Sequence, residues 1–205
     1  GEMNNKGYEI SVSYKNSWGD LKYEFAANTT SVENTLVSLG GGQPILDGKR
    51  GAIYLTKTAE GYPVGSFFGY VTDRLFQEND FDENGDLIGH AIQPGAEPGD
   101  IKFKDLNGDG IITDGDRGYI DNPQPDFIYG FYMNFEFRGF DLHADFHGTY
   151  GSEIYSTLNL GLLDGSGVYN KRREILDAWT PENTDTDMPR LVWSDPNNNI
   201  RPSDR

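Results

Sequence analysis

The chain has 205 residues, of which 33 are acidic and 17 are basic, and its formal net charge is −16. This excess of negative charge argues against a surface that binds nucleic acid, and it suits cation-binding loops that face water. The sequence contains no cysteine, so it offers neither disulfides nor a thiol nucleophile. It also lacks any run of about 18 apolar residues, and it therefore predicts no transmembrane helix.

The first predicted element is a β-hairpin. Apolar and polar residues alternate from Tyr8 to Lys15, and the alternation resumes from Leu21 to Ala27. The break at Asn16–Asp20 predicts a turn between the two runs. We therefore expect a hairpin over residues 7–29 with one apolar and one polar face.

A long excursion is predicted for residues 30–125. Its first part, Thr30–Leu39, is compatible with a short helix capped by Ser31 and ended by glycines. A short strand is expected over Gly51–Lys57, and an aromatic strand or turn segment over Gly65–Phe76.

Within this excursion, the segment from Asp105 to Asp116 has the spacing of a calcium-binding loop. Side-chain oxygens stand at the first, third and fifth positions, a glycine occupies the sharp turn at the sixth, a backbone carbonyl follows, and an acid closes the loop. The predicted ligands are Asp105, Asn107, Asp109, the backbone carbonyl of Ile111, and Asp116.

The residue that closes this loop departs from the EF-hand pattern. An EF-hand has glutamate there, whereas Asp116 is shorter and resembles the closing acid of dockerin-type loops. The predicted ion is a structural Ca²⁺. The alternative is a surface turn without an ion, because Asp, Asn and Gly form turns by themselves.

A second acidic stretch, Asp80–Asp86, matches half of the same pattern. Its closing position falls on Ala91, which has no side-chain oxygen. The favoured interpretation is a hairpin turn built on Asn84–Gly85.

A second hairpin is predicted over residues 126–149. Alternation is strongest in Phe127–Arg138 and Phe140–His147, which flank a tight turn at Arg138–Gly139. Each strand has about ten residues, the length that a tilted strand needs to cross a bilayer. A soluble β-sandwich requires the same alternation, but the abundance of Phe and Tyr favours a membrane barrel.

Residues 150–205 are predicted to form a second long loop region. Ser152–Gly167 is rich in Gly and Ser, and Val168–Trp179 has helical character that ends at Thr180–Pro181. The remainder is polar and without periodicity. The aromatic side chains of this region that could stack on sugar rings are Trp179, Trp193 and Tyr169, although packing within the loops is the favoured interpretation.

The sequence predicts no enzyme. His143 and His147 alternate with Asp141 and Asp145. On a strand these four side chains share one face at intervals of about 7 Å, as expected for a polar row that faces a barrel lumen. No nucleophile motif or phosphate-binding loop accompanies them.

Several stretches resemble the SusC/RagA family of TonB-dependent outer-membrane transporters, and they occur in the order found in that family. The matching stretches are Gly65–Asp73, Pro98–Gly110, Asp116–Arg117, Asn122–Pro125, Gly139–Leu142, Ala178–Asn183 and Arg201–Arg205. They are spread over residues 65–205, which is most of the region 7–205.

The resemblance implies a mainly β fold, with antiparallel hairpins from part of an outer-membrane β-barrel, long extracellular loops and one or two short helices. It implies a piece of the C-terminal barrel region of an importer of glycans, oligosaccharides or peptides in the bacterial outer membrane. The implied partners are a SusD-like surface lipoprotein and TonB, the latter contacted through parts that lie outside this chain.

One alternative to the transporter hypothesis remains at this level. A soluble, calcium-stabilised β-sandwich, either an adhesin or a carbohydrate-binding module, would also explain acidic loops and alternating strands. It does not explain the ordered set of family stretches.

Overall fold

The computed structural model describes residues 1–50 and 53–205, and its fold is mainly β, as predicted. The chain divides into two compact units, which we call the sheet unit and the loop unit. The sheet unit comprises Gly1–Gly48, Thr56–Ser66 and Asn122–Ile154; the loop unit comprises Lys49–Leu55, Phe67–Asp121 and Tyr155–Arg205.

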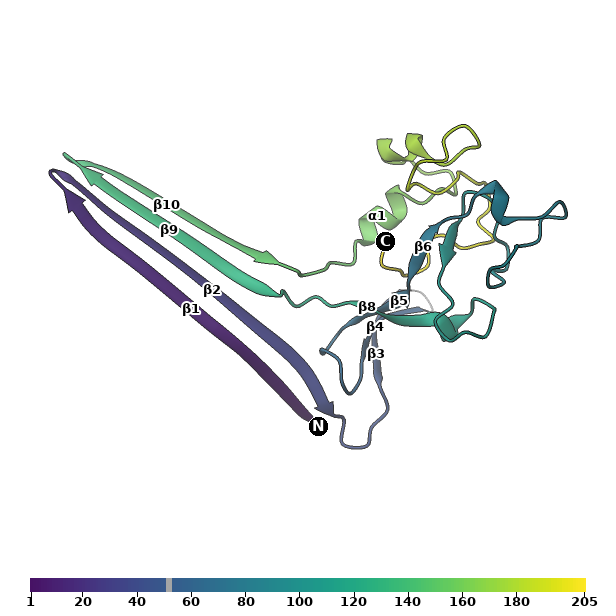
Figure 1. Ribbon diagram of the computed structural model, residues 1–205, viewed down its shortest axis with the longest axis horizontal. Coiled ribbons are helices and arrows are strands. Elements are labelled where there is room, and N and C mark those ends of the chain that lie inside the picture. Colours follow the sequence, from purple (N-terminus) through teal and green to yellow (C-terminus); the bar gives the residue numbers. More distant parts are fainter. Residues whose placement is uncertain (51–52) are drawn as a thin grey trace. The chain divides into compact units, whose positions relative to one another are not determined.

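The sheet unit is built on an open, four-stranded sheet with the strand order β1-β2-β9-β10 (Figure 1). Its strands are β1 (Glu2–Trp18), β2 (Leu21–Ser38), β9 (Phe127–Phe137) and β10 (Phe140–Tyr150). All neighbouring pairs are antiparallel, and β2 pairs with β9 from Leu21 opposite Phe137 to Thr30 opposite Ile128. The two hairpins thus pair with each other through their inner strands.

Two-residue turns close both hairpins. Gly19–Asp20 connects β1 to β2, and Arg138–Gly139 connects β9 to β10. Arg138 and Gly139 have φ angles of 48° and 86°, the left-handed conformations that match the twist of a tight hairpin. The Arg138 Nε donates to Asp20 Oδ2 at 2.8 Å, so the two turns lie at the same end of the sheet.

The helix expected for Thr30–Leu39 is wrong, because β2 continues through this segment to Ser38. Its residues include Thr30, Val32, Thr35 and Val37, which are β-branched and favour extended backbone. They pair with the first half of β1, whose polar sequence gave no strand signal. Long-range pairing therefore overrides the local helix signals.

The two faces of this sheet differ as the alternation predicts. Phe25 contacts the rings of Phe131 and Phe135, with centroids 6.5 and 5.5 Å away. On the other face, Lys22 pairs with Glu136 at 3.0 Å. Large side chains of the apolar face that remain exposed include Tyr8, Ile10, Val12, Tyr14, Phe140, Leu142 and Phe146.

The other strands are short. They are β3 (Ile45–Arg50), β4 (Ile53–Thr58), β5 (Phe67–Tyr70) and β8 (Arg117–Asp121), which form a sheet in that order, and the pair β6 (Thr72–Leu75) and β7 (Ile101–Phe103). The strand expected over Gly51–Lys57 corresponds to β4, while Gly51 and Ala52 lie outside the described residues.

The core of the loop unit gathers residues from segments far apart in the sequence. It comprises Tyr70, Leu75, Ile101, Phe103, Ile112 and Trp179. Trp179 packs directly over Gly99, whose φ of 87° and lack of a side chain allow this close approach.

Helical structure is limited to short segments. Instead of a helix over Val168–Trp179 there is a 3₁₀ helix at Arg173–Asp177, and α1 (Thr157–Leu162) forms where a loop was expected. The Ser156 side chain caps α1 by accepting from Asn159 N. None of the described helices has the length and apolar character needed to cross a membrane.

We expect the two tryptophans of the C-terminal region to differ in their contribution to stability. Trp179 is 6% exposed and Trp193 is 84% exposed. Trp179→Ala should lower the free energy of opening of the loop unit by roughly 3–5 kcal/mol, because it leaves a cavity in the core. Trp193→Ala should change it by less than about 0.5 kcal/mol.

Hydrogen exchange at the Ile101 and Phe103 amides would measure both effects. Equal effects of the two substitutions would contradict the core assignment.

Candidate metal centre

The loop from Asp105 to Asp116 lies between β7 and β8, and both of its ends are anchored. Lys104 N donates to Val71 O at 2.9 Å just before the loop. After the loop, the Arg117 guanidinium donates to the carbonyls of Tyr54 and Phe68 and lies over the Phe68 ring.

Three predicted ligands come together in this loop. Carboxylate oxygens of Asp105, Asp109 and Asp116 all lie within 4.8 Å of one another. Asp116 is fully buried, Asp105 is half-buried and Asp109 is exposed. Like charges at this separation repel by roughly 1 kcal/mol per pair in water and by more in less polar surroundings. The cluster could therefore hold a metal ion.

The backbone curls around the first of these carboxylates. Asp105 Oδ1 accepts from Gly108 N at 2.6 Å, and its Oδ2 accepts from Gly110 N at 2.9 Å. The two glycines have φ angles of 74° and 84°, which residues with a Cβ rarely adopt. The glycine at the sixth loop position thus allows the turn that the motif requires.

Asp116 is the most tightly bound of the three carboxylates. Its Oδ1 accepts from Leu106 N at 3.0 Å, and its Oδ2 accepts from Thr113 N at 2.7 Å. Burial by itself raises the pKa of Asp116, but the N–H groups of Thr113, Asn107 and Leu106 outweigh burial and lower the pKa below its ordinary value. Asp116 therefore stays ionised.

The two other predicted ligands have different surroundings. The Asn107 side chain accepts from Asp109 N at 2.8 Å and donates to Asp109 Oδ2 at 3.0 Å. The backbone N–H of Ile111, the residue whose carbonyl is the predicted ligand, donates to Asp109 Oδ1 at 2.9 Å. Because an amide oxygen has two lone pairs, the Asn107 oxygen could keep its hydrogen bond from Asp109 N and still bind an ion.

The second acidic stretch forms a hairpin turn, as favoured from the sequence. Asp82 N donates to Asp86 O at 2.9 Å, and Gly85 has a φ of 84°.

Asp80, at the start of this stretch, is buried and accepts two hydrogen bonds from the Arg74 guanidinium, at 2.5 and 2.6 Å. His90 Nε2 lies 2.9 Å from the same carboxylate. Asp80 is therefore committed to an ion pair.

The polar row of β10 does not gather around a point. His143 lies opposite Asn134 and His147 lies opposite Gly130, four residues apart along the strand. This separation is about 13 Å, which is too long for two ligands of one ion.

The exposed aromatics proposed from the sequence fall into two groups. Trp179 is buried, and its Nε1 donates to Gln77 Oε1 at 3.1 Å, so it packs within the loops. Tyr169 and Trp193 are exposed.

Sequence reasoning missed the buried polar residues of the loop unit, among them Gln93, Asp100 and Asn197. None of them belongs to a periodic pattern or a ligand motif. Only the tertiary structure places them together.

Asp80→Asn should destabilise the segment around residues 77–90 by roughly 2–3 kcal/mol, because the Arg74 side chain loses a charged acceptor. This loss of stability is smaller than that of breaking a fully buried ion pair, because the Arg74 side chain is 42% exposed. Asp86→Asn, an exposed change in the same turn, is the control.

The same pair predicts a pH dependence. The Arg74 guanidinium holds the pKa of Asp80 well below its usual range. Asp80 thus contributes stability that is present above its unfolded-state pKa of about 3.9 and is lost as pH falls through the lower folded-state pKa. The protection factors of the 77–90 amides, which are corrected for the intrinsic pH dependence of exchange, should fall on acidification below about pH 4, and by less in Asp80→Asn. Identical acid profiles would refute this.

Comparison with known proteins gives a consistent picture. No protein-family profile matches the chain. It is 36% identical to TonB-dependent receptor P3 of Formosa agariphila over 196 residues, and 30% identical to TonB-dependent receptor P26 of the same organism over 194 residues. Both matches cover 93% of this chain and 19% of the relative.

The fold also matches solved structures. A structure of the RagAB peptide transporter gives a TM-score of 0.69 at 21% identity, covering 94% of this chain and 20% of that chain. The open-open state of the RagAB peptide importer gives a TM-score of 0.70 with the same coverage. These named relatives are receptors and transporters, not enzymes. The chain therefore belongs to the TonB-dependent receptors, as its resemblance to the SusC/RagA family indicated, and spans about one fifth of the length of the relatives that it matches.

Proposed function

We propose that this chain forms part of the barrel wall and two long loops of a TonB-dependent importer in the bacterial outer membrane. The observation that carries the proposal is the sheet β1-β2-β9-β10, whose large apolar side chains remain exposed on one face while charged pairs occupy the other. A barrel wall needs such a sheet, with lipid outside and a wet lumen inside.

The same observation argues against the soluble β-sandwich. A sandwich buries the apolar faces of its two sheets against each other. In this chain Tyr8, Val12 and Phe146 are each more than half exposed. Such a face is stable where hydrocarbon surrounds it.

The turns support an orientation in the membrane. Barrels of this kind have short periplasmic turns and longer extracellular loops. The turns Gly19–Asp20 and Arg138–Gly139 would then be periplasmic, and residues 39–126 and 151–205 would be extracellular.

The proposed role of the Asp105–Asp116 loop is to bind a structural Ca²⁺. Ca²⁺ takes six to eight oxygen ligands, and the carboxylate, amide and backbone oxygens of this loop are ligands of that kind. The three carboxylate oxygens lie within 4.8 Å of one another, close enough for one ion to contact all three. The ion would cancel the repulsion of the acids and order the loop.

The substrate and partner classes follow from the family. One similar structure is named a peptide transporter, and the SusC/RagA resemblance also includes glycans and oligosaccharides as substrates. The proposed partners are a SusD-like surface lipoprotein at the loops and TonB through parts outside this chain.

Calorimetric titration of Ca²⁺ into chelator-treated protein tests the metal proposal. We expect binding to the unmodified protein and at least a tenfold loss of affinity in Asp109→Ala, because one of three clustered carboxylates is removed. Asp109 is exposed, so this variant should still fold. Asp82→Ala is the matched control, since Asp82 starts a similar turn outside the cluster. Absence of binding to the unmodified protein would reduce the loop to a turn.

Cysteine labelling tests the barrel proposal. Because this chain has no native cysteine, an introduced cysteine is the only labelled position within it. In intact cells, a membrane-impermeant maleimide should label Glu83→Cys in the loops and spare Ser17→Cys beside a turn. In isolated membranes, Ser13→Cys on the polar face should react at least about tenfold faster than Val12→Cys on the apolar face. Equal reactivity of Ser13→Cys and Val12→Cys would rule out a lipid-facing surface.

A further inference from the structure

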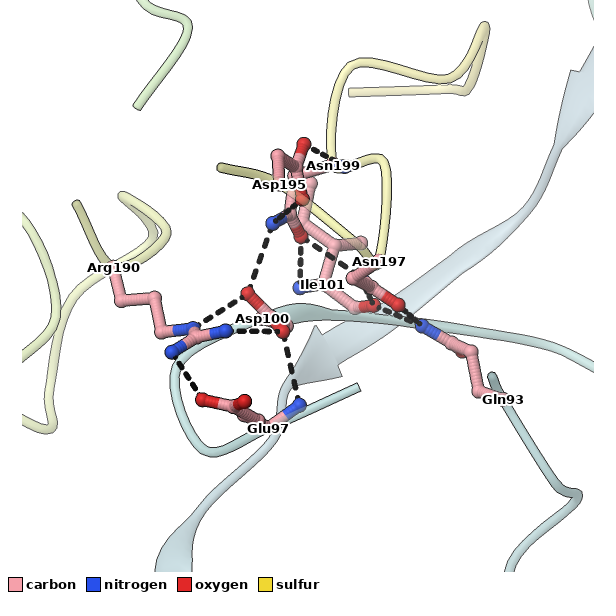
Figure 2. Close-up of polar contacts among 8 residues, drawn as sticks. All are labelled: Gln93, Glu97, Asp100, Ile101, Arg190, Asp195, Asn197 and Asn199. Atoms are coloured by element: carbon pink, nitrogen blue, oxygen red, sulfur yellow. Dashed lines mark hydrogen bonds and ion pairs between the residues drawn. The ribbon is translucent and has the colours of Figure 1, made fainter. Parts of the chain in front are cut away.

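A buried polar network joins two distant segments of the loop unit (Figure 2). The first segment runs from Gln93 to Phe103 and ends in β7. The second is residues 190–204, which we call the strap. Of the network residues, Gln93, Asp100 and Asn197 are almost completely buried.

An ion pair stands at one end of the strap. Arg190 Nε donates to Asp100 Oδ1 at 2.9 Å, and a second guanidinium nitrogen donates to Asp100 Oδ2 at 3.2 Å. The third nitrogen reaches Glu97 Oε2 at 2.5 Å. Because Asp100 is fully buried, loss of Arg190 would leave its negative charge without a counterion.

Side-chain amides attach the middle of the strap to β7. The Asn199 amide donates to Asp100 Oδ1 at 2.9 Å, and its oxygen accepts from Ile101 N at 2.7 Å. The Gln93 amide donates to Ile101 O and to Asn197 Oδ1 at 2.7 and 2.6 Å. Backbone groups of β7 are thereby satisfied by side chains.

The far end of the strap is held at the junction of β5 and β6. Tyr70 N donates to Pro202 O at 2.8 Å, and Asp204 N donates to Tyr70 O at 3.3 Å. Asp204 Oδ1 accepts from both the amide and the hydroxyl of Thr72, at 2.9 and 2.8 Å. Arg201 lies over the Tyr70 ring, with its guanidinium carbon 5.2 Å from the centroid.

These attachments are mainly polar, and none of the six residues of the apolar core belongs to the strap. A buried polar network stabilises only when its members are all satisfied, so its loss is expected to be cooperative. The strap belongs to the segment that follows β10, and its contacts lie in the connection between β2 and β9.

We propose that the strap is a latch that joins these two long connections into one cooperative unit, with Arg190 as the positioning residue on which it depends. The two connections then order and open together. The latch requires neither metal binding nor transport.

The test is amide hydrogen exchange in the Arg190→Met variant. It is measured in the full-length protein that contains this chain. We expect amides at both attachment points, Tyr70 and Ile101, and the strap amide of Asp204 to exchange about 100-fold faster or more, because a buried carboxylate is left unpaired. The amides of β1, β2, β9 and β10 should not change.

Arg172→Met is the matched control. Arg172 belongs to the same C-terminal region and pairs with Glu174, but both side chains are about half exposed. A surface pair contributes little, so exchange should change by less than about threefold. Adding Asp100→Asn to Arg190→Met should recover at least about tenfold of the lost protection, because it removes the unpaired charge.

If Arg190→Met fails to fold, Arg190→Lys keeps the positive charge and loses the forked donors. It should then open the same amides by about tenfold. The proposal is overturned if opening stays confined to residues 189–191 while Tyr70 and Ile101 remain protected. Equal exchange in the Arg190→Met and Arg172→Met variants would also overturn it.

Discussion

The loop unit depends on backbone N–H groups that must find acceptors where strands are too short to supply them. Carboxylates and amides take this role at several turns. Asp105 accepts from Gly108 and Gly110, and Asp116 accepts from Leu106 and Thr113. Side-chain acceptors offer these backbone N–H groups partners outside helices and strand ladders, so they fix the course of the chain at the turns.

This requirement explains why so many acids serve structure. Asp80 accepts hydrogen bonds from the Arg74 side chain and from Gln77 N. Asp100 accepts hydrogen bonds from the Arg190 side chain and from Glu97 N. Only Asp105, Asp109 and Asp116 bring three carboxylates close together among the described residues. The high negative charge of the chain is therefore divided between turn formation, ion pairs and one cluster suited to a cation.

In the sheet unit, other strands rather than side chains supply the partners of the backbone N–H groups. Its long strands satisfy backbone groups through ladder hydrogen bonds, which leaves the side chains free to divide between two faces. Rings such as Phe25 and Phe131 gather on one face, and the Lys22–Glu136 pair lies on the other. The surroundings of this sheet, rather than its hydrogen bonds, decide which face is covered.

Prediction from sequence succeeded where the physics is local. Alternation located the strand cores of both hairpins, and Arg138–Gly139 marked a turn that forms where expected. It failed for Thr30–Leu39, since the strand state there depends on pairing with the polar start of β1. It also missed the extent of order in residues 183–205, because polar residues without periodicity give no signal for a buried network.

The sequence by itself determined the mainly β class, the two-faced hairpins, the spacing of the acidic loop and the resemblance to a transporter family. These features follow from side-chain alternation and from turn residues, which act over a few neighbouring positions. The tertiary structure alone decided that β2 pairs with β9, that Trp179 is buried, and that Arg190 meets Asp100 across about ninety residues. Contacts between residues so far apart in the sequence form only when folding brings distant segments together. Once polar groups are buried there, leaving one of them without a hydrogen-bond partner would cost stability.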